Sequence, residues 1–326
     1  MVASRGLFAC IAILLTGALA PVRANDIPWP ERPVKLIVPF QPGSSSDVIG
    51  RIVANYLGPQ LKSSVTVENR VGGSTIIGTG LIARAEPDGY TMGLANTSTH
   101  AATFASGAAL PFDPVADFIP VAMIGSSPFL LLGSTKLPAR SLKDLIAYAR
   151  QNPAKLNYAS AGTATISHLA GELFQKLAGV KIVHVPYRGT STSVYDVLEG
   201  RMDLLIGVIN STQDFVRNGQ IVAFATLAPQ RVAALPDVPT AAEAGLPGCE
   251  ADLWTAIVLP AGVPKPIVDK LNRELNAILA MDEVLANLRK QGVEPETGSP
   301  EAVARRVKAD IERWRYLIET QKIGKN

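Results

Sequence analysis

The sequence predicts an α/β protein made of two lobes, and three observations lead to this expectation. Its 326 residues are enough for about two domains. Short apolar runs typical of buried strands alternate with segments of helical spacing, which is the pattern of parallel βαβ units in a covered sheet. The alternation occurs in two successive stretches without detectable sequence repetition. We predict that residues 25–125 and 250–326 form the first domain and residues 126–249 the second.

The first stretch begins with an apolar strand at residues 35–40 and a helix at residues 47–61. Further strands are expected at residues 64–69 and 90–95, with a helix at residues 75–85 between them. The apolar stripe of the first helix consists of Val48, Ile52, Val53, Tyr56 and Leu57.

The second stretch repeats this pattern, and a helical tail follows it. Its first helix begins at Ser141, a favourable N-cap, with Asp144 in the first turn. In the last helix of the tail apolar side chains recur every three to four residues, so we expect that stripe to face the core. The expected helices are 141–151, 165–178, 194–199, 267–280, 282–291 and 300–319, and the expected strands are 156–159, 181–185, 203–208, 221–227 and 254–259.

The first residues have the pattern of a secretory signal. A basic start ending at Arg5 precedes an apolar run from Leu7 to Leu19. The run is shorter than the about 20 residues that cross a membrane. We therefore predict export, with residues 1–24 forming a signal peptide that is cleaved after Ala24. The alternative is a lipoprotein, but Cys10 lies within the apolar run, where lipid attachment is unfavourable.

The composition and motifs exclude several classes of protein. The formal net charge of +3 falls to near +1 without Arg5 and Arg23 of the leader, which is too little for a nucleic-acid-binding surface. Cys249 is the one cysteine after cleavage, so we expect no internal disulfide. We find neither the G-x-S-x-G elbow of hydrolases nor the H-E-x-x-H metal motif. We expect no catalytic centre, no metal and no cofactor.

The stretch VPFQPGSSSD, residues 38–47, connects the first strand to the first helix. Gly43 permits close approach of the backbone, and Ser44, Ser45, Ser46 or Asp47 can cap the helix. A helix start offers unpaired N–H groups and a partial positive charge, which together bind anions. A well-capped helix that binds no ligand is the alternative interpretation of this stretch.

The stretch YASAGTATISHLA, residues 158–170, has the same composition and falls in the second predicted domain. Gly162 lies at its turn, and Thr163, Thr165 and Ser167 add hydroxyl groups. Two such helix starts in opposite lobes would fit a ligand with two polar ends, such as a dicarboxylate. Neither stretch contains lysine or arginine, so we expect neutral donors to hold the ligand.

Three other loops also follow predicted strands, at residues 69–75, 96–100 and 186–189. Ligands of open α/β sheets bind at such strand ends. Arg188 could meet a ligand carboxylate or be an ordinary surface charge. Asp203 could be a strand-end carboxylate or a polar group at the floor of the pocket, and the sequence leaves both open.

Six segments of the chain resemble, in register, the solute receptors of tripartite tricarboxylate transporters, often called the Bug family. The resemblance implies a two-lobed type II periplasmic binding protein fold: two α/β domains with a ligand cleft between them. The matching segments are WPERPVKLIVPFQPGSSSD, VENRVGGSTIIG, EPDGYTMGL, NYASAGTATISHLAGELF, HVPYRGTSTSVYDVLEGRMDLL and PDVPTAAEAGLPG with LWTAIVLPAGVP. The implied ligand contacts are Phe40, Pro42, Gly43, Ser44, Ser45, Asp47, Gly73, Ser74, Thr75, Ser98, Thr99, Ser160, Gly162, Thr163, Ser167, Tyr187 and Asp203.

The resemblance also implies a function and its partners. A monomeric periplasmic receptor of this kind captures a small organic carboxylate, either a di- or tricarboxylate or an aromatic acid, and delivers it to membrane permease subunits. Partnership with a two-component sensor kinase is the main alternative, and an exported hydrolase is a less favoured one. The chain departs from the family pattern where Ser44, Ser74 and Thr75 stand in place of glycine. These hydroxyl groups put the commonest family ligands in doubt.

Overall fold

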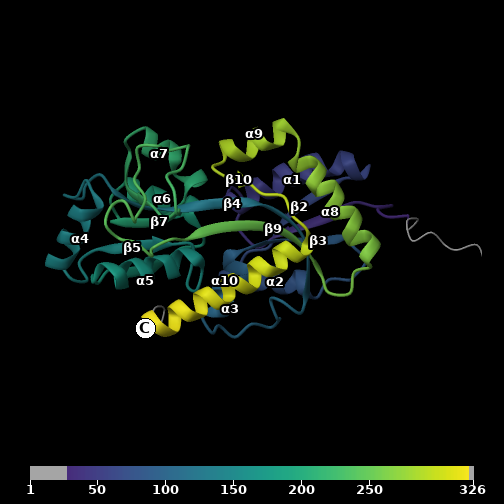
Figure 1. Ribbon diagram of the computed structural model, residues 1–326, viewed down its shortest axis with the longest axis horizontal. Coiled ribbons are helices and arrows are strands. Elements are labelled where there is room, and N and C mark those ends of the chain that lie inside the picture. Colours follow the sequence, from purple (N-terminus) through teal and green to yellow (C-terminus); the bar gives the residue numbers. More distant parts are fainter. Residues whose placement is uncertain (1–27, 323–326) are drawn as a thin grey trace, which may run out of the picture.

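The computed structural model describes residues 28–322, and the chain forms two lobes joined side by side (Figure 1). The predicted signal peptide and the lipoprotein alternative lie outside the described residues. Among the described residues, no helix is long and apolar enough to cross a membrane.

The first lobe combines the N-terminal elements with the C-terminal helices (Figure 1). Its elements are β1 (Val34–Val38), α1 (Ser45–Leu61), β2 (Val65–Asn69), η1 (Gly73–Thr75), α2 (Ile76–Ala83), β3 (Thr91–Asn96), η2 (Ser98–Ala102), α3 (Thr103–Ala105), α8 (Lys265–Leu279), α9 (Asp282–Lys290), β10 (Glu294–Pro295) and α10 (Pro300–Gln321).

The second lobe is formed by the middle of the chain, and two long strands, β4 (Phe118–Ser134) and β9 (Asp252–Pro260), connect it to the first. Its elements are α4 (Leu142–Gln151), β5 (Asn157–Ser160), α5 (Ile166–Ala178), β6 (Val183–Pro186), α6 (Thr190–Leu198), β7 (Leu204–Val208), η3 (Ile209–Ser211), α7 (Gln213–Arg217) and β8 (Ile221–Thr226).

A continuous sheet runs through both lobes in the order β2-β1-β3-β9-β4-β7-β5-β6. Within the first lobe β1 pairs in parallel with β2 and β3, and within the second β5 pairs in parallel with β6 and β7. β4 changes partner midway: it pairs with β9 up to Pro128 and with β7 and β8 from Phe129 onward. The predicted domain edges at residues 126 and 250 lie in these connecting strands, and we retain that division as a proposal.

β4 was not expected as a strand. The turn-like composition of Gly-Ser-Ser-Pro at residues 125–128 masked it, because such residues usually interrupt a strand. In the structure this segment continues through the sheet as the crossing between the lobes. β10, a two-residue strand that pairs with β4, was not expected either.

The last helix holds the lobes together from one side (Figure 1). Val303, Val307 and Ile311 of α10 pack in a core cluster of the first lobe. Trp314 and Ile318, farther along the same helix, pack in the core of the second lobe. The prediction that this stripe faces the core is confirmed.

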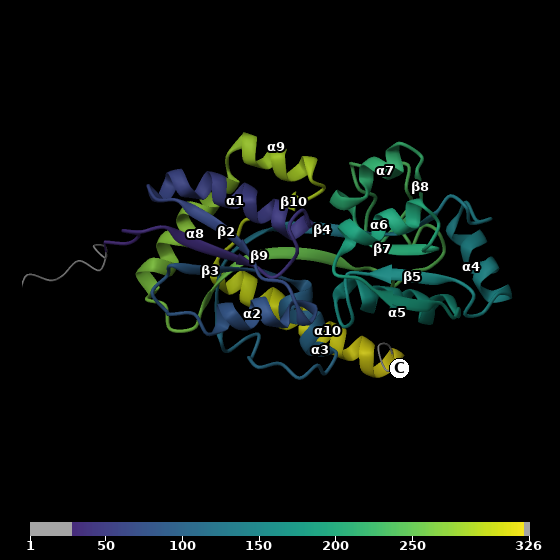
Figure 2. The same cartoon turned by 180° about the vertical axis from the view of Figure 1, so that it is seen from behind.

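The carboxyl ends of β1, β3, β5, β6 and β7 lead into loops and helix starts. Figure 2 shows α1 and α2 of one lobe opposite α5 and α6 of the other. The parallel pairing of the strands therefore brings the loops of the predicted ligand contacts to the interlobe boundary.

Candidate functional site

The first helix-start loop uses one of its four candidate caps. Ser44 is the N-cap of α1, with extended backbone angles, and its hydroxyl accepts a hydrogen bond of 3.3 Å from the amide of Asp47. Gly43 has a φ of +76°, which glycine adopts without strain. The first-turn amides of Ser45 and Ser46 have no acceptor within the helix, so they carry the positive end of its dipole.

Asp47 supports this loop from inside. Its side chain is 2% exposed and accepts hydrogen bonds from the Gly43 amide at 2.8 Å and from Asn69 Nδ2 at 2.9 Å. Arg51 Nε donates to the same carboxylate at 3.0 Å. Burial raises the pKa of Asp47, but these donors outweigh it and leave the pKa below its ordinary value. The carboxylate is thus occupied within its own lobe, and its contact with a ligand stays a prediction.

The loop before α2 carries unusual backbone angles. Four consecutive residues have positive φ values: Gly72 (+134°), Gly73 (+55°), Ser74 (+50°) and Thr75 (+85°). For serine, and still more for a β-branched threonine, such angles store strain of about 1–3 kcal/mol each. Ser74 is half-buried and Thr75 is buried.

Asn96, at the end of β3, organises the next loop. Its side-chain oxygen accepts the amides of Ser98 and Thr99 at 2.9 and 3.1 Å, and its Nδ2 donates to Ser46 Oγ at 3.2 Å. The Thr99 hydroxyl is used within the turn, in contact with His100 Nδ1 at 2.8 Å. Burial lowers the pKa of His100 to about 3, so this imidazole is neutral.

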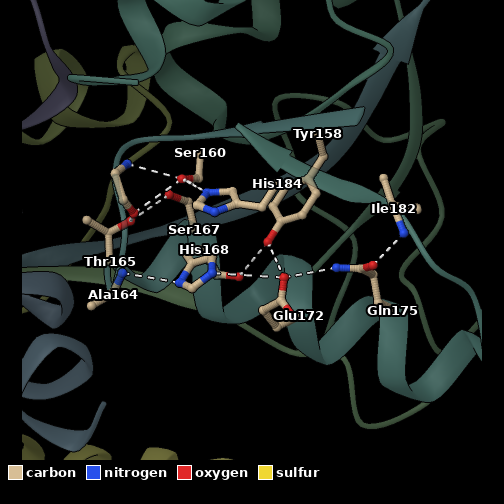
Figure 3. Close-up of polar contacts among 11 residues, drawn as sticks. Tyr158, Ser160, Ala164, Thr165, Ser167, His168, Glu172, Gln175, Ile182 and His184 are labelled. Carbon is tan, nitrogen blue, oxygen red and sulfur yellow. Dashed lines mark hydrogen bonds and ion pairs between the residues drawn. The ribbon is translucent and has the colours of Figure 1, made fainter. Parts of the chain in front are cut away.

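The second helix-start loop lies between β5 and α5 (Figure 3). The Ser160 hydroxyl accepts the amide of Gly162 at 3.1 Å, and the Ser167 hydroxyl accepts the amide of Ala161 at 2.9 Å. Thr165 Oγ1 donates to the Gly162 carbonyl at 2.6 Å. These side chains hold the loop, so the groups it can offer to a ligand are first-turn amides of α5.

Two stacked histidines support this second loop from behind (Figure 3). The rings of His168 and His184 lie 4.1 Å apart. His168 Nδ1 accepts the Ala164 amide at 3.1 Å, and His184 Nε2 contacts Ser160 Oγ at 2.7 Å. Burial lowers the pKa of each imidazole to about 4, and for His184 the neighbouring His168 contributes to this lowering. Both rings are therefore neutral supports of the loop.

Glu172 extends this support toward the body of the second lobe (Figure 3). Its Oε1 accepts the Tyr158 hydroxyl at 2.6 Å and Gln175 Nε2 at 2.9 Å. Gln175 in turn accepts the Ile182 amide at 2.6 Å. The loop is thus connected through side chains to α5 and to the residue that precedes β6.

Two further predicted contact residues, Asp203 and Tyr187, have hydrogen-bond partners within the second lobe. Asp203 precedes β7 at the amino end of the strand, where its carboxylate accepts the Asn157 amide at 2.9 Å. It is a strand-end carboxylate, since the interlobe loops follow the opposite ends of these strands. The Tyr187 hydroxyl donates to Asp196, so it is committed within its own lobe. Arg188 is exposed.

The remaining predicted residues differ in how far they reach the boundary. Phe40 is half-buried and packs against the core of the first lobe, while its carbonyl accepts Asn69 Nδ2 at 3.0 Å. Pro42 and Thr163 are exposed. Each belongs to a loop that touches the other lobe, but no hydrogen bond across the boundary uses its side chain.

The two lobes are in contact at this boundary. The Ser98 hydroxyl accepts the Ile166 amide of α5 at 3.2 Å, and Asn210 Nδ2 donates to Ser45 Oγ at 2.5 Å. Gln41 Nε2 donates to Ser191 Oγ at 2.5 Å. Together with Asn96, Ser98 joins the start of α1 to the start of α5 through a chain of hydrogen bonds.

Several of these residues were absent from the predicted contact set: Gln41, Ser46, Asn96, Ser191 and Asn210. Asn210 had a usable signal, because it follows β7 at its carboxyl end. Ser191 and Gln41 are 150 residues apart in the chain, and no local pattern relates them.

Two cavities lie near the boundary. One of about 200 Å³ is lined by residues of both lobes, including Gly43, Ser45, Ser191 and Asn210, and therefore adjoins the first helix start. A larger one of about 810 Å³ lies beside the connecting strands, and none of the predicted contact residues lines it. Within residues 28–322, no group of three or more acidic, histidine or cysteine side chains could hold a metal ion.

The model of the tripartite tricarboxylate transporter family receptor matches residues 49–323. The chain belongs to this family. The family is one of solute-binding receptors and not of enzymes.

Individual relatives cover nearly the whole chain. BugT of Bordetella pertussis is 35% identical over 309 residues, which are 94% of each chain. Rpa4515 of R. palustris, solved with adipate, is 37% identical with a TM-score of 0.87 and covers 90% of this chain and 99% of its own. MatC of Rhodopseudomonas palustris, solved with bound malate, is 31% identical with a TM-score of 0.85 over 89% and 100%. The predicted two-lobed α/β fold of a periplasmic binding protein is confirmed.

Proposed function

We propose that this receptor captures a small organic carboxylate between its lobes in the periplasm and delivers it to the membrane subunits of a tripartite transporter. The observation that carries the proposal is the meeting of two helix starts, α1 and α5, across the lobe boundary. Both supply first-turn amides, which bind a carboxylate by hydrogen bonds and by the helix dipole. Relatives solved with adipate and with malate support a ligand of this class.

The ligand would be held without a buried ion pair. Within the described residues, no lysine or arginine is buried. The buried polar side chains around the boundary are mainly serine, threonine and asparagine, such as Ser46, Asn96 and Ser98. Neutral donors stabilise a carboxylate at a smaller desolvation cost than a buried guanidinium does. Release to a partner would then require separation of the lobes and no exchange of counter-charges.

Binding would be coupled to closure of the lobes. A ligand that touches both helix starts has contacts in the closed form that the open form lacks, so it shifts the population toward closure. The cross-lobe hydrogen bonds of Ser45, Ser98 and Gln41 would form in the same step. No finding favours the sensor-kinase alternative over transport.

Titration calorimetry of the mature protein with mono-, di- and tricarboxylates and aromatic acids tests this proposal. We expect saturable binding of at least one acid at one site per chain, and compaction in X-ray scattering when that acid is added. Ser45→Trp should hold the lobes apart and weaken binding at least tenfold, because the indole occupies the place of the contact with Asn210. Ser64→Trp, at an exposed position before β2, is the matched control and should bind normally. Absence of binding to every acid would contradict the proposal.

A further inference from the structure

The loop before α2 keeps two hydroxyl residues in a conformation that suits glycine. Ser74 and Thr75 have φ values of +50° and +85°. Gly72 and Gly73 precede them, so the chain already uses glycine in the first half of this turn. Glycine at the next two positions would remove the strain. Strained non-glycine residues persist where their side chains are needed, and they are concentrated at ligand sites.

Ser74 reaches the other lobe. A Cβ placed on Gly162 would lie 3.3 Å from Ser74 Oγ. The Ser74 hydroxyl is therefore close to the turn at Gly162 in the second helix-start loop. Gly162 itself has a φ of +135° and is buried. The contact joins the strained loop of the first lobe to the loop that offers the amides of α5.

Thr75 supplies a second hydroxyl in the same loop. The residue is 6% exposed, and its carbonyl accepts a hydrogen bond from Thr79 Oγ1 at 3.0 Å. None of the hydrogen bonds among the described residues involves the Thr75 hydroxyl. The Thr75 hydroxyl is not among the enclosed side-chain atoms that lack a partner, so it still reaches solvent and is free to meet a hydrogen-bonding group of a ligand.

We propose that the hydroxyls of Ser74 and Thr75 are specificity determinants that bind a second hydrogen-bonding group of the ligand. This inference rests on the proposed function, since it takes the carboxylate to lie at the two helix starts. A second carboxylate or a hydroxyl on the ligand satisfies the hydroxyl of Thr75 and is enclosed by Ser74 when the lobes meet. The receptor therefore selects acids with two polar groups over acids of the same size with one.

Two pairs of variants separate a ligand contact from a structural role. Ser74→Ala and Thr75→Val remove the hydroxyls but keep a side chain in the strained conformation. Ser74→Gly and Thr75→Gly remove the hydroxyls and also relieve the strain, so these variants should melt a few degrees higher than the original protein. A purely structural role for the hydroxyls predicts lower melting temperatures in all four variants.

Calorimetry with matched acids measures the selection. Adipate is compared with hexanoate, and 4-hydroxybenzoate with benzoate, because each pair differs in one terminal group. We expect the original protein to prefer the acid with two polar groups in at least one pair by about tenfold, the effect of one or two hydrogen bonds. The combined Ser74→Ala and Thr75→Val variant should lose this preference, while its affinity for the singly polar acid stays within about twofold.

The outcomes separate the two proposals. If the original protein binds an acid but the combined variant keeps the preference, or if the original protein has no preference, the specificity role is overturned and the carboxylate receptor stands. Loss of stability in both glycine variants would also overturn it, because the side chains would then serve the fold. If none of the four acids and no acid of the wider panel binds, the proposed function fails and this inference falls with it.

Discussion

The two helix-start loops face the same boundary but are supported by opposite electrostatic means. The loop of the first lobe is organised by a charged carboxylate, Asp47, which gathers donors from Gly43, Arg51 and Asn69. The loop of the second lobe is organised by two neutral imidazoles, His168 and His184. The support of the first loop requires an ionised carboxylate, whereas the support of the second loop requires both imidazoles to be uncharged.

This difference separates the pH ranges in which the two loops are stable. The pKa of Asp47 lies below its ordinary value of 3.8, so its contribution is present above that pH and is lost only as the pH falls through the lowered value. The histidines have pKa values of about 4, lowered from 6.5. The unfolded chain therefore binds more protons than the folded one between pH 6.5 and 4, and stability from this pair is lost as the pH falls through that range.

Acidification should destabilise the second helix-start loop before the first. From pH 7 to 4.5 we expect the free energy of unfolding to fall, because protonation would place two charges in contact at the stacked pair. The fall should be smaller than the full pKa shifts imply, since His184 is partly exposed and solvent screens its charge. Amide hydrogen exchange, corrected for intrinsic rates, should show residues 160–167 losing protection before residues 43–48. Equal loss in both loops would contradict the assignment of separate supports.

A variant that lacks both histidines is the control for this effect. Replacing both His168 and His184 by glutamine keeps hydrogen-bonding groups but removes the titration, so the variant should be less stable at pH 7 and should lose less stability on acidification. His100, whose pKa is lowered to about 3, remains in that variant and gives the residual slope. If the free energy of unfolding fell equally with pH in this variant and in the original protein, other groups would be responsible for the pH dependence.

The same short motif, a serine followed three residues later by an aspartate, occurs at two helix starts. Ser44 and Asp47 at the start of α1 have the same spacing as Ser141 and Asp144 at the start of α4, and in each case the serine hydroxyl accepts the aspartate amide. Asp47→Ala should cost about 2–3 kcal/mol, because it leaves the Gly43 amide and Asn69 without their buried acceptor. Asp144→Ala, at a fully exposed position, should cost much less, because solvent replaces the contacts of its carboxylate at the start of α4. Urea unfolding of both variants measures the difference, and equal costs would contradict a special role for Asp47.

That pair of motifs also shows what could be predicted from the sequence. Local rules placed the Ser141 cap correctly and limited the other cap to four neighbouring residues that include Ser44, because a cap depends on residues within one helical turn. They could not distinguish Asp47 from Asp144, since the difference arises from Asn69, which lies on a separate strand. Asp203 could have been excluded by strand direction alone, because ligands bind beyond the carboxyl ends of parallel strands and it precedes β7.

The hydrogen bonds between the lobes could not be predicted from local sequence, for a different reason. They depend on where β4 and β9 place one lobe against the other, and a turn-like Gly-Ser-Ser-Pro hid the crossing in β4. Once the crossing is known, the carboxyl end of β7 identifies Asn210 as a residue of the boundary. The alternation of strands and helices predicted the two lobes, but only the structure shows which residues form hydrogen bonds between them.

The smallest expected effect concerns the hydrogen bond that connects the two loops. Ser98→Ala removes the acceptor for the Ile166 amide at the start of α5 and leaves the Asn96 turn intact, because that turn uses the amide of Ser98. The free energy of unfolding should change by about 0.5–1 kcal/mol, and the affinity for a bound acid should fall about three- to fivefold, since a contact specific to the closed form is lost. Ser106→Ala, whose hydroxyl donates to Thr103 within the first lobe, is the control and should leave affinity unchanged. If Ser98→Ala lowered the free energy of unfolding by the expected amount but left the affinity intact, the hydrogen bond would belong to the fold of the ligand-free protein and not to ligand-driven closure.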